Sequence, residues 1–249
     1  MLRPLSACAL ATFALVTCAA TPAFAEAPAE GLMKRLAAHA ASFEAMRTHA
    51  SYAAQGKLEQ LDGDGKVSGV KEMHARVEAD GTRAKFVVLS YFEDGTDKTE
   101  DARKDAKDRA EKKDPDREKR QIRMPFLASQ KDRYVFDVAE KDKADPSRVR
   151  ITFVPVTKDE STIEGSAWVD ERAGTVLSAG FKVSRTSMWV DYMHIQVEFG
   201  APTPLGPAVS KVSMDGKGGI LFLRKHFRAE ATLSDYKITQ DATTVAATR

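Results

Sequence analysis

Between residues 161 and 200 the chain alternates apolar and polar residues in three consecutive segments, and this pattern strongly limits the possible folds. In the third segment one set of positions carries bulky apolar side chains, at Trp189, Met193, Ile195, Val197 and Phe199. The positions between them carry mostly polar ones, such as His194, Gln196 and Glu198. Alternation with a period of two is typical of a β-strand with one buried face. The region therefore predicts three strands that bury apolar side chains on one side of a curved sheet.

The joins between these strands are short and contain Asp or Gly, as in residues 170–174, and such joins favour antiparallel hairpins. Similar patterns predict further strands at about 51–61, 67–79, 83–92, 132–140, 147–156, 209–214 and 219–235. Asp-Gly pairs at 62–65 and 80–81 and the Asp-Gly/Gly-Gly run at 215–219 indicate turns between neighbours. An apolar stripe at three- and four-residue spacing predicts a helix over 30–52. The expected class is mainly β (α+β), with a curved antiparallel sheet of about ten strands.

The first 25 residues have the pattern of an export signal. Arg3 supplies a positive charge, residues 5–17 are apolar but too short to span a bilayer, and Ala23–Ala25 match a cleavage site. The predicted product is a periplasmic protein that begins at Glu26, with no transmembrane span in its sequence. An alternative is that residues 15–18 form a lipobox, with Cys18 acylated as a membrane anchor.

Both cysteines, Cys8 and Cys18, lie in this leader. A chain cleaved after Ala25 has no thiol for a disulfide, a metal site or a nucleophile. The five histidines are scattered, without a pair at i,i+3 or i,i+4 spacing. No nucleophile elbow or phosphate loop is present, and the Asp-Gly-Asp-Gly run at 62–65 lacks the remaining ligands of a calcium loop. We therefore expect no catalytic residue, metal or cofactor, although an enzyme is carried as a third hypothesis.

A charged segment at 97–123 interrupts the strand pattern. Lys/Arg and Asp/Glu are nearly balanced in it, many at helical spacing, and no apolar stripe is present. It predicts an exposed helical insertion, with a docking surface for an envelope protein as the functional alternative. The net charge of the whole chain is only +2, which gives no footprint for nucleic acid.

Several segments resemble the outer-membrane lipoprotein-sorting family, the LolA- and LolB-like carriers. They are residues 165–170 with 174–177, the strand at 189–199, the run at 221–228 and the closing 234–237. The resemblance implies that residues 26–240 form a single carrier-like domain, followed by a loose tail at 241–249. It further implies an incomplete β-barrel, an N-terminal helical lid, and an apolar cavity that shelters the acyl chains of lipoproteins or other lipids.

The widths of the predicted elements point to a cavity independently of this resemblance. One helix is about 10 Å wide, whereas ten strands spaced at roughly 4.8 Å form a far wider face. Part of that face would lack a protein partner, and soluble proteins rarely leave a large apolar patch unused. The alternative is an ordinary core in which the protein's own side chains fill the space.

We expect the cavity to be lined by inward-facing strand residues and roofed by apolar residues of the helix. The expected strand residues are Phe136, Val138, Phe153, Phe181, Val183, Trp189, Ile195, Val197, Phe199, Leu221 and Leu223. The expected lid residues are Met33, Leu36, Phe43 and Met46. The predicted function is a monomeric, non-enzymatic carrier of a lipid or of lipoprotein acyl chains. The alternative is an envelope regulator or assembly factor that senses lipoproteins and docks a partner through residues 97–123.

Overall fold

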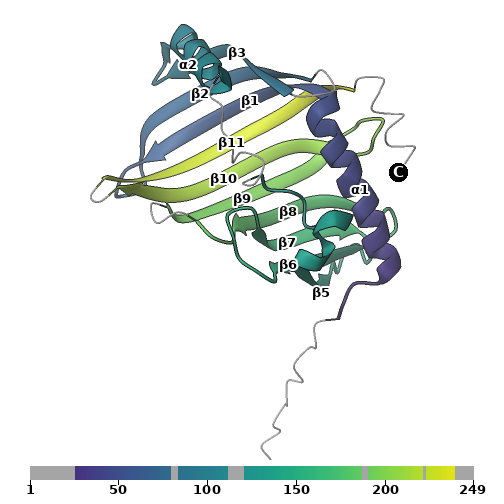
Figure 1. The fold of residues 1–249 in the computed structure, drawn as a ribbon. Helices are drawn as coiled ribbons and strands as arrows, with labels where there is room; N and C mark the ends of the chain where they lie inside the picture. The colour runs from purple at the N-terminus through teal and green to yellow at the C-terminus, as the bar shows by residue number, and fades with distance from the viewer. Residues whose placement is uncertain (1–25, 80–83, 112–120, 187–189, 221–222, 239–249) are drawn as a thin grey trace, which may run out of the picture.

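The computed structural model describes residues 26–79, 84–111, 121–186, 190–220 and 223–238. They form one eleven-stranded sheet crossed by a long helix (Figure 1). The helices are α1 (Glu30–His49), α2 (Thr99–Glu111) and the 3-10 helix η1 (Ala128–Arg133). The strands are β1 (Ala50–Leu61), β2 (Val67–Ala79), β3 (Ala84–Glu93), β4 (Thr96–Asp97), β5 (Tyr134–Lys141), β6 (Arg148–Pro155), β7 (Ile163–Asp170), β8 (Thr175–Val183), β9 (Val190–Ala201), β10 (Ala208–Ile220) and β11 (Leu223–Ile238). The mainly β class is confirmed.

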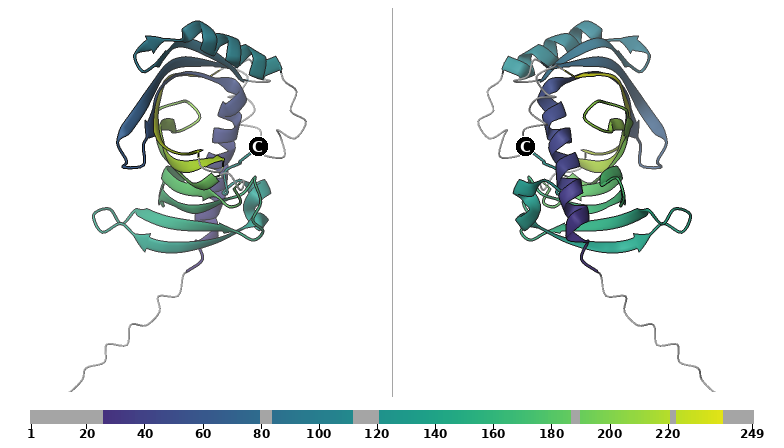
Figure 2. Two further views of the ribbon diagram at one scale, coloured as in Figure 1. Left: turned by 90° about the vertical axis from the view of Figure 1, so that its left-hand side faces the viewer. Right: turned by 90° about the vertical axis from the view of Figure 1, so that its right-hand side faces the viewer.

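All the paired strands are antiparallel, in the order β4-β3-β2-β1-β11-β10-β9-β8-β7-β6-β5. Except for β4 and β5, strands that follow one another in the chain pair with each other, and β1 also pairs with β11, which places the first long strand beside the last. Within the described residues β4 and β5 form two unpaired edges, so the sheet curls around α1 without closing (Figure 2). The predicted incomplete barrel is confirmed.

The helix α1 lies across the concave side of the sheet and buries the predicted apolar stripe. Leu36 and Ala40 are fully buried, and Leu32 is nearly so. The helix ends at His49, three residues before the predicted end at Tyr52. The prediction was wrong there because Ala50 and Ser51 already pair with β11, while the Tyr52 ring stacks on Tyr236 with 5.0 Å between centroids. Strand pairing therefore replaces the helix without an intervening loop.

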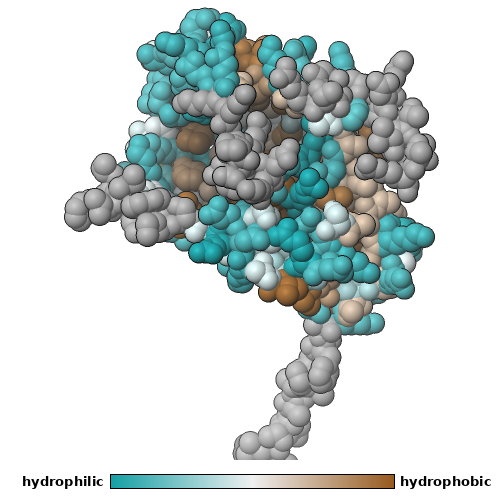
Figure 3. All heavy atoms as spheres, viewed as in Figure 1, coloured by the Kyte–Doolittle hydropathy of each residue, from teal (hydrophilic) through white to brown (hydrophobic). Residues whose placement is uncertain are grey.

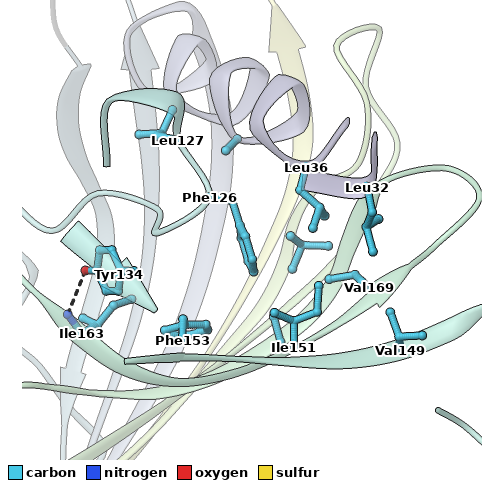
Figure 4. Packing of buried hydrophobic residues seen from close by; sticks show 13 residues of the cluster. Leu32, Leu36, Phe126, Leu127, Tyr134, Val149, Ile151, Phe153, Ile163 and Val169 are labelled. Atoms are coloured by element: carbon cyan, nitrogen blue, oxygen red, sulfur yellow. Dashed lines mark hydrogen bonds between the residues drawn. The ribbon is translucent and has the colours of Figure 1, made fainter. Parts of the chain in front are cut away.

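A dense core fills the space between the first half of α1 and strands β5 to β8 (Figure 4). In β6 alternate residues face this core: Val149, Ile151 and Phe153 are almost completely buried. Each such buried side chain contributes roughly 1.5–3 kcal/mol to folding. The Tyr134 hydroxyl accepts a hydrogen bond of 3.2 Å from the backbone N–H of Ile163, so the core also satisfies its polar group. In this half of the molecule the protein's own side chains occupy the interior.

The last two strands differ from the prediction. Residues 215–219 do not form a turn, because β10 continues to Ile220 and β11 begins at Leu223. Gly216 pairs with Phe227 across the strands, and a Cβ atom at Gly216 would lie 2.7 Å from the Phe227 Cζ atom. Glycine therefore allows an aromatic ring to lie over the strand, which is a second use of glycine in a sheet besides forming a turn.

Among the described residues of the charged segment only α2 is helical, and it has no buried residue, so its predicted exclusion from the core is confirmed. Asp97 belongs to β4, residues 112–120 lie outside the described part of the chain, and residues 121–123 follow as irregular backbone. The helix is attached to the sheet through Arg103, whose Nε and Nη2 atoms donate hydrogen bonds of 3.0 Å to the carbonyls of Val88 and Leu89. These carbonyls belong to β3, so α2 lies beside an edge of the sheet (Figure 2).

Candidate ligand-binding cavity

A cavity of about 380 Å³ lies between the second half of α1, the segment before η1 and the inner faces of β6 to β11. This volume is within the range of about 300–1,000 Å³ that small-molecule sites occupy. Its lining residues are Phe43, Glu44, Met46, Arg47, Tyr52, Ile122, Arg123, Met124, Pro125, Phe126, Phe153, Ile163, Val176, Ala179, Phe181, Val197, Phe199, Ala208, Val209, Val212, Leu233 and Tyr236. Nearly all of them are apolar or aromatic. Figure 3 shows hydrophobic residues inside a hollow on the face below α2.

The floor of the cavity is formed by small and branched side chains on neighbouring strands. Ala179 of β8 pairs with Val197 of β9, and Val197 in turn pairs with Val212 of β10. Because side chains alternate along a strand, these three residues share the inner face. None of them is large, so the row leaves space beneath the helix.

The roof is the second half of α1. Phe43 meets Phe199 edge to face, with 5.6 Å between ring centroids. Met46 is buried, and its Sδ atom accepts a contact of 3.8 Å from the Thr203 hydroxyl. Methionine adapts its shape easily, which suits a surface that must pack both with and without a guest.

One wall consists of the segment that follows the charged insertion. Ile122, Met124, Pro125 and Phe126 line the cavity, and Phe126 stacks on Phe136 with 5.4 Å between centroids. None of these four residues was among those expected to line the cavity. Ile122 and Met124 gave no usable signal, because they stand singly at the end of a highly charged segment.

The structure brings six of the expected residues to the cavity wall, namely Phe153, Phe181, Val197, Phe199, Phe43 and Met46. Met33, Leu36 and Phe136 instead belong to the adjoining core. Val138, Val183 and Ile195 lie on described strands but not on the cavity wall. Trp189 and Leu221 lie outside the described residues, and Leu223 is described only as the first residue of β11.

His39 connects α1 to two distant parts of the sheet. Its Nδ1 atom accepts a hydrogen bond of 3.3 Å from the Val176 backbone N–H, and its Nε2–H donates to the Pro207 carbonyl at 3.3 Å. A backbone N–H can only donate and a carbonyl can only accept, so these partners require the neutral imidazole with its proton on Nε2. Burial lowers the pKa of His39 below the ordinary 6.5, and the hydrogen bond to Pro207 partly opposes this shift.

The folded protein should therefore lose stability in acid through His39. Between the lowered folded pKa and the unfolded value near 6.5, the unfolded chain binds more protons, so this contribution is complete above pH 6.5 and falls as the pH drops through the folded pKa. Urea unfolding from pH 8 to pH 5 should show a smaller loss of stability for His39→Gln than for the native chain. Parallel pH profiles would contradict the role given to His39, and the other titrating groups cancel in the comparison.

A polar cluster lies on the opposite, convex face of the sheet. The His226 Nε2 atom is 3.1 Å from the Tyr192 hydroxyl and 3.1 Å from Asp215 Oδ2. These residues belong to three different strands, and no spacing in the sequence could have placed them together. The cluster contains a single histidine and faces away from the apolar cavity.

Neither a metal site nor a membrane span is found in the described part of the chain. No group of three or more His, Cys, Asp or Glu side chains there has the geometry to hold a metal ion. Among the described helices none combines the length and the apolar character needed to cross a bilayer. The predicted leader, its cleavage site and Cys18 lie outside the described residues.

No protein-family model and no curated protein matches this sequence. Among solved structures, a LolA superfamily protein from Nitrosomonas europaea matches over 84% of this chain and 94% of its own, with a TM-score of 0.37 and 9% identity. An outer membrane lipoprotein-sorting protein domain from Vibrio parahaemolyticus matches over 87% and 98%, with a TM-score of 0.42 and 12% identity. The MucA/MucB complex of Pseudomonas aeruginosa matches over 87% and 97%, with a TM-score of 0.23 and 11% identity.

These TM-scores are low and no identity exceeds 12%, so the functions of those proteins do not carry over to this chain. The matched structures nevertheless include a LolA superfamily protein and an outer membrane lipoprotein-sorting domain, the group that the sequence motifs resemble.

Proposed function

We propose that this protein is a non-enzymatic carrier that holds one hydrocarbon chain, from a lipid or from a lipoprotein, in the cavity beneath α1. The observation that carries the proposal is the cavity of about 380 Å³ with its almost wholly apolar lining. Water gains little in such a space, whereas each methylene buried there contributes about 0.8 kcal/mol. Because the predicted leader directs export, the working compartment would be the periplasm.

The roof of the cavity would move when a hydrocarbon chain is loaded. Phe43 and Met46 belong to one helix, which continues directly into β1 at Ala50. A small displacement of the second half of α1, between its anchors in the dense core and in β1, would widen the cavity while Leu32 and Leu36 stay in place. The guest would shift the balance between a covered and an open state.

The direct test is binding of a neutral fluorescent hydrocarbon probe, combined with native mass spectrometry of protein isolated from the cell envelope. A saturable fluorescence increase, competed by long-chain lipids, and a co-purifying lipid mass would support the carrier. No uptake of the probe and a clean mass of the chain alone would overturn it.

A second candidate function, an envelope regulator that docks a partner, is favoured by one observation. The helix α2 is charged, has no buried residue and stands beside a free edge of the sheet. Most of its side chains make no contribution to the core, so they are available to a protein of complementary charge.

Reversing exposed charges on α2 separates the two candidates. We expect Lys104→Glu with Arg109→Glu to leave hydrocarbon binding within about twofold, since both residues are exposed and remote from the cavity. Arg103 is kept because it attaches the helix to β3. If the variant binds the probe but no longer captures an envelope protein that the native chain captures, the regulator gains support. Loss of probe binding would contradict the placement of the site.

A further inference from the structure

Charged side chains interrupt the apolar lining at the rim of the cavity. Glu44 and Arg47 come from the last turns of α1, and Arg123 comes from the segment that faces them. Two cations and one carboxylate give this rim a net charge of +1. An apolar cavity that needed only to exclude water would not require charges at its edge, and charged groups beside a low-dielectric interior interact more strongly than in water.

Arg47 is held in place by two partners, one from α1 and one from the segment that faces it. Its Nη1 atom lies 3.2 Å from Glu44 Oε2 and 3.4 Å from Glu44 Oε1, and the Gln121 carboxamide contacts the same guanidinium. A guanidinium has five N–H donors, so these contacts leave others available. They also fix the side chain, which reduces the entropy that binding a further acceptor would cost.

The field of Arg47 reaches the cavity wall. Burial raises the pKa of the Tyr52 hydroxyl, and the positive charge of Arg47 opposes that rise. Tyr52 lines the cavity, where its ring stacks on Tyr236. The charged rim at Arg47 therefore lies next to the aromatic wall at Tyr52.

Arg123 adds a second positive charge to the rim. It is exposed, lines the cavity, and forms no ion pair within the described residues. A carboxylate or phosphate between the two arginines would have charge-assisted hydrogen bonds from both, and guanidinium groups match these planar or branched acceptors well. A purely neutral guest would leave this positive rim without a counterpart.

Building on the carrier function, we propose that the cavity selects amphiphiles with an anionic head group, held at Arg47 and Arg123, and with a hydrocarbon tail in the apolar space. The shared chemistry of the head group is a carboxylate or a phosphate monoester. The tail supplies most of the affinity, and the head group supplies the selection and the orientation.

The test is competition against a neutral fluorescent hydrocarbon probe by three twelve-carbon amphiphiles at pH 8, namely dodecanoate, dodecyl phosphate and dodecanol. The native chain should bind at least one of the anions about 10-fold more tightly than the alcohol, and the stronger anion identifies the head group. The preference should weaken as salt is raised, because the rim is partly solvent-exposed.

Variants separate this proposal from the carrier function. Arg47→Gln with Arg123→Gln should abolish the preference of the anions over dodecanol, and the matching lysine replacements should keep part of it. Arg123→Gln alone should reduce it several-fold without any risk to folding, since that side chain is exposed. Arg109→Gln, on the remote surface of α2, is the control and should change nothing.

Equal binding of anions and alcohol by the native chain, or an unchanged preference in the double variant, would overturn the head-group proposal alone. Failure of the probe and of all three amphiphiles to bind would overturn the carrier function itself.

Discussion

Replacing Gly165 by alanine is expected to lower the free energy of unfolding by about 3 kcal/mol, the upper end of the usual cost of overpacking. A Cβ atom there would lie 2.1 Å from the Gly180 carbonyl oxygen, 2.7 Å from the Phe181 Cα atom and 2.8 Å from its Cβ atom. Two of these atoms are backbone atoms of β8, so no change of rotamer can relieve the overlap. Strands β7 and β8 would have to separate, and Phe181 would leave the cavity wall.

Gly180→Ala is the matched control, because it lies on the partner strand of the same hairpin. A Cβ atom at Gly180 would meet nothing closer than the Gln196 Cγ atom at 3.9 Å. Alanine in a strand costs less backbone entropy than glycine, so this variant should be neutral or more stable by up to about 1 kcal/mol. Equilibrium urea unfolding followed by circular dichroism measures both. If the two variants were equally stable, the close approach of β8 to Gly165 would not be the reason why glycine occupies that position.

The second large effect is expected from filling the cavity. Val197→Trp places a large ring on the inner face between Ala179 and Val212. If the ring excludes three methylenes of a bound chain, the loss is about 2.4 kcal/mol, or about 50-fold in the dissociation constant. Stability should change little, because the ring occupies existing space and does not displace packed atoms.

Gln196→Trp is the control for this change. Gln196 is the preceding residue of β9, is exposed on the opposite face, and does not line the cavity. The Gln196→Trp variant should bind the hydrocarbon probe as the native chain does. At the same probe concentrations the Val197→Trp variant should show no binding. Unchanged binding by Val197→Trp, with native stability, would place the hydrocarbon somewhere else.

The β-strands were predictable where turn residues and alternation agree. The prediction for β2, residues 67–79, matches its bounds in the structure because the preceding turn at 62–65 fixes its start. In β9, Ile195, Val197 and Phe199 are more buried than His194, Gln196 and Glu198, as the alternation requires. In both cases the signal is local, since a strand with one covered face imposes a period of two on its own residues.

Predictions failed where a partner distant in the sequence decides the structure. The predicted helix extends to Tyr52, yet Ala50 and Ser51 already pair with Ile238 and Lys237 of β11. Gly216 reads as a turn residue, yet it makes room for the Phe227 ring. Neither partner can be identified from the neighbouring residues, so local propensity gave the wrong boundary.

The candidate site shows the same division. Alternation put Phe181, Val197 and Phe199 on the covered side, but it could not tell which covered residues face space and which face other side chains. Phe136 and Leu36 carry equally strong apolar signals and lie in the dense core.

The sequence by itself determined a curved antiparallel sheet with one apolar face, a helix to cover it and a charged segment excluded from the core. Only the tertiary structure decided that one half of the interior is filled while the other keeps a cavity with Arg47 and Arg123 at its rim. The physical reason is that burial patterns are local, whereas the volume left between a helix and a sheet depends on how all the surrounding side chains pack together.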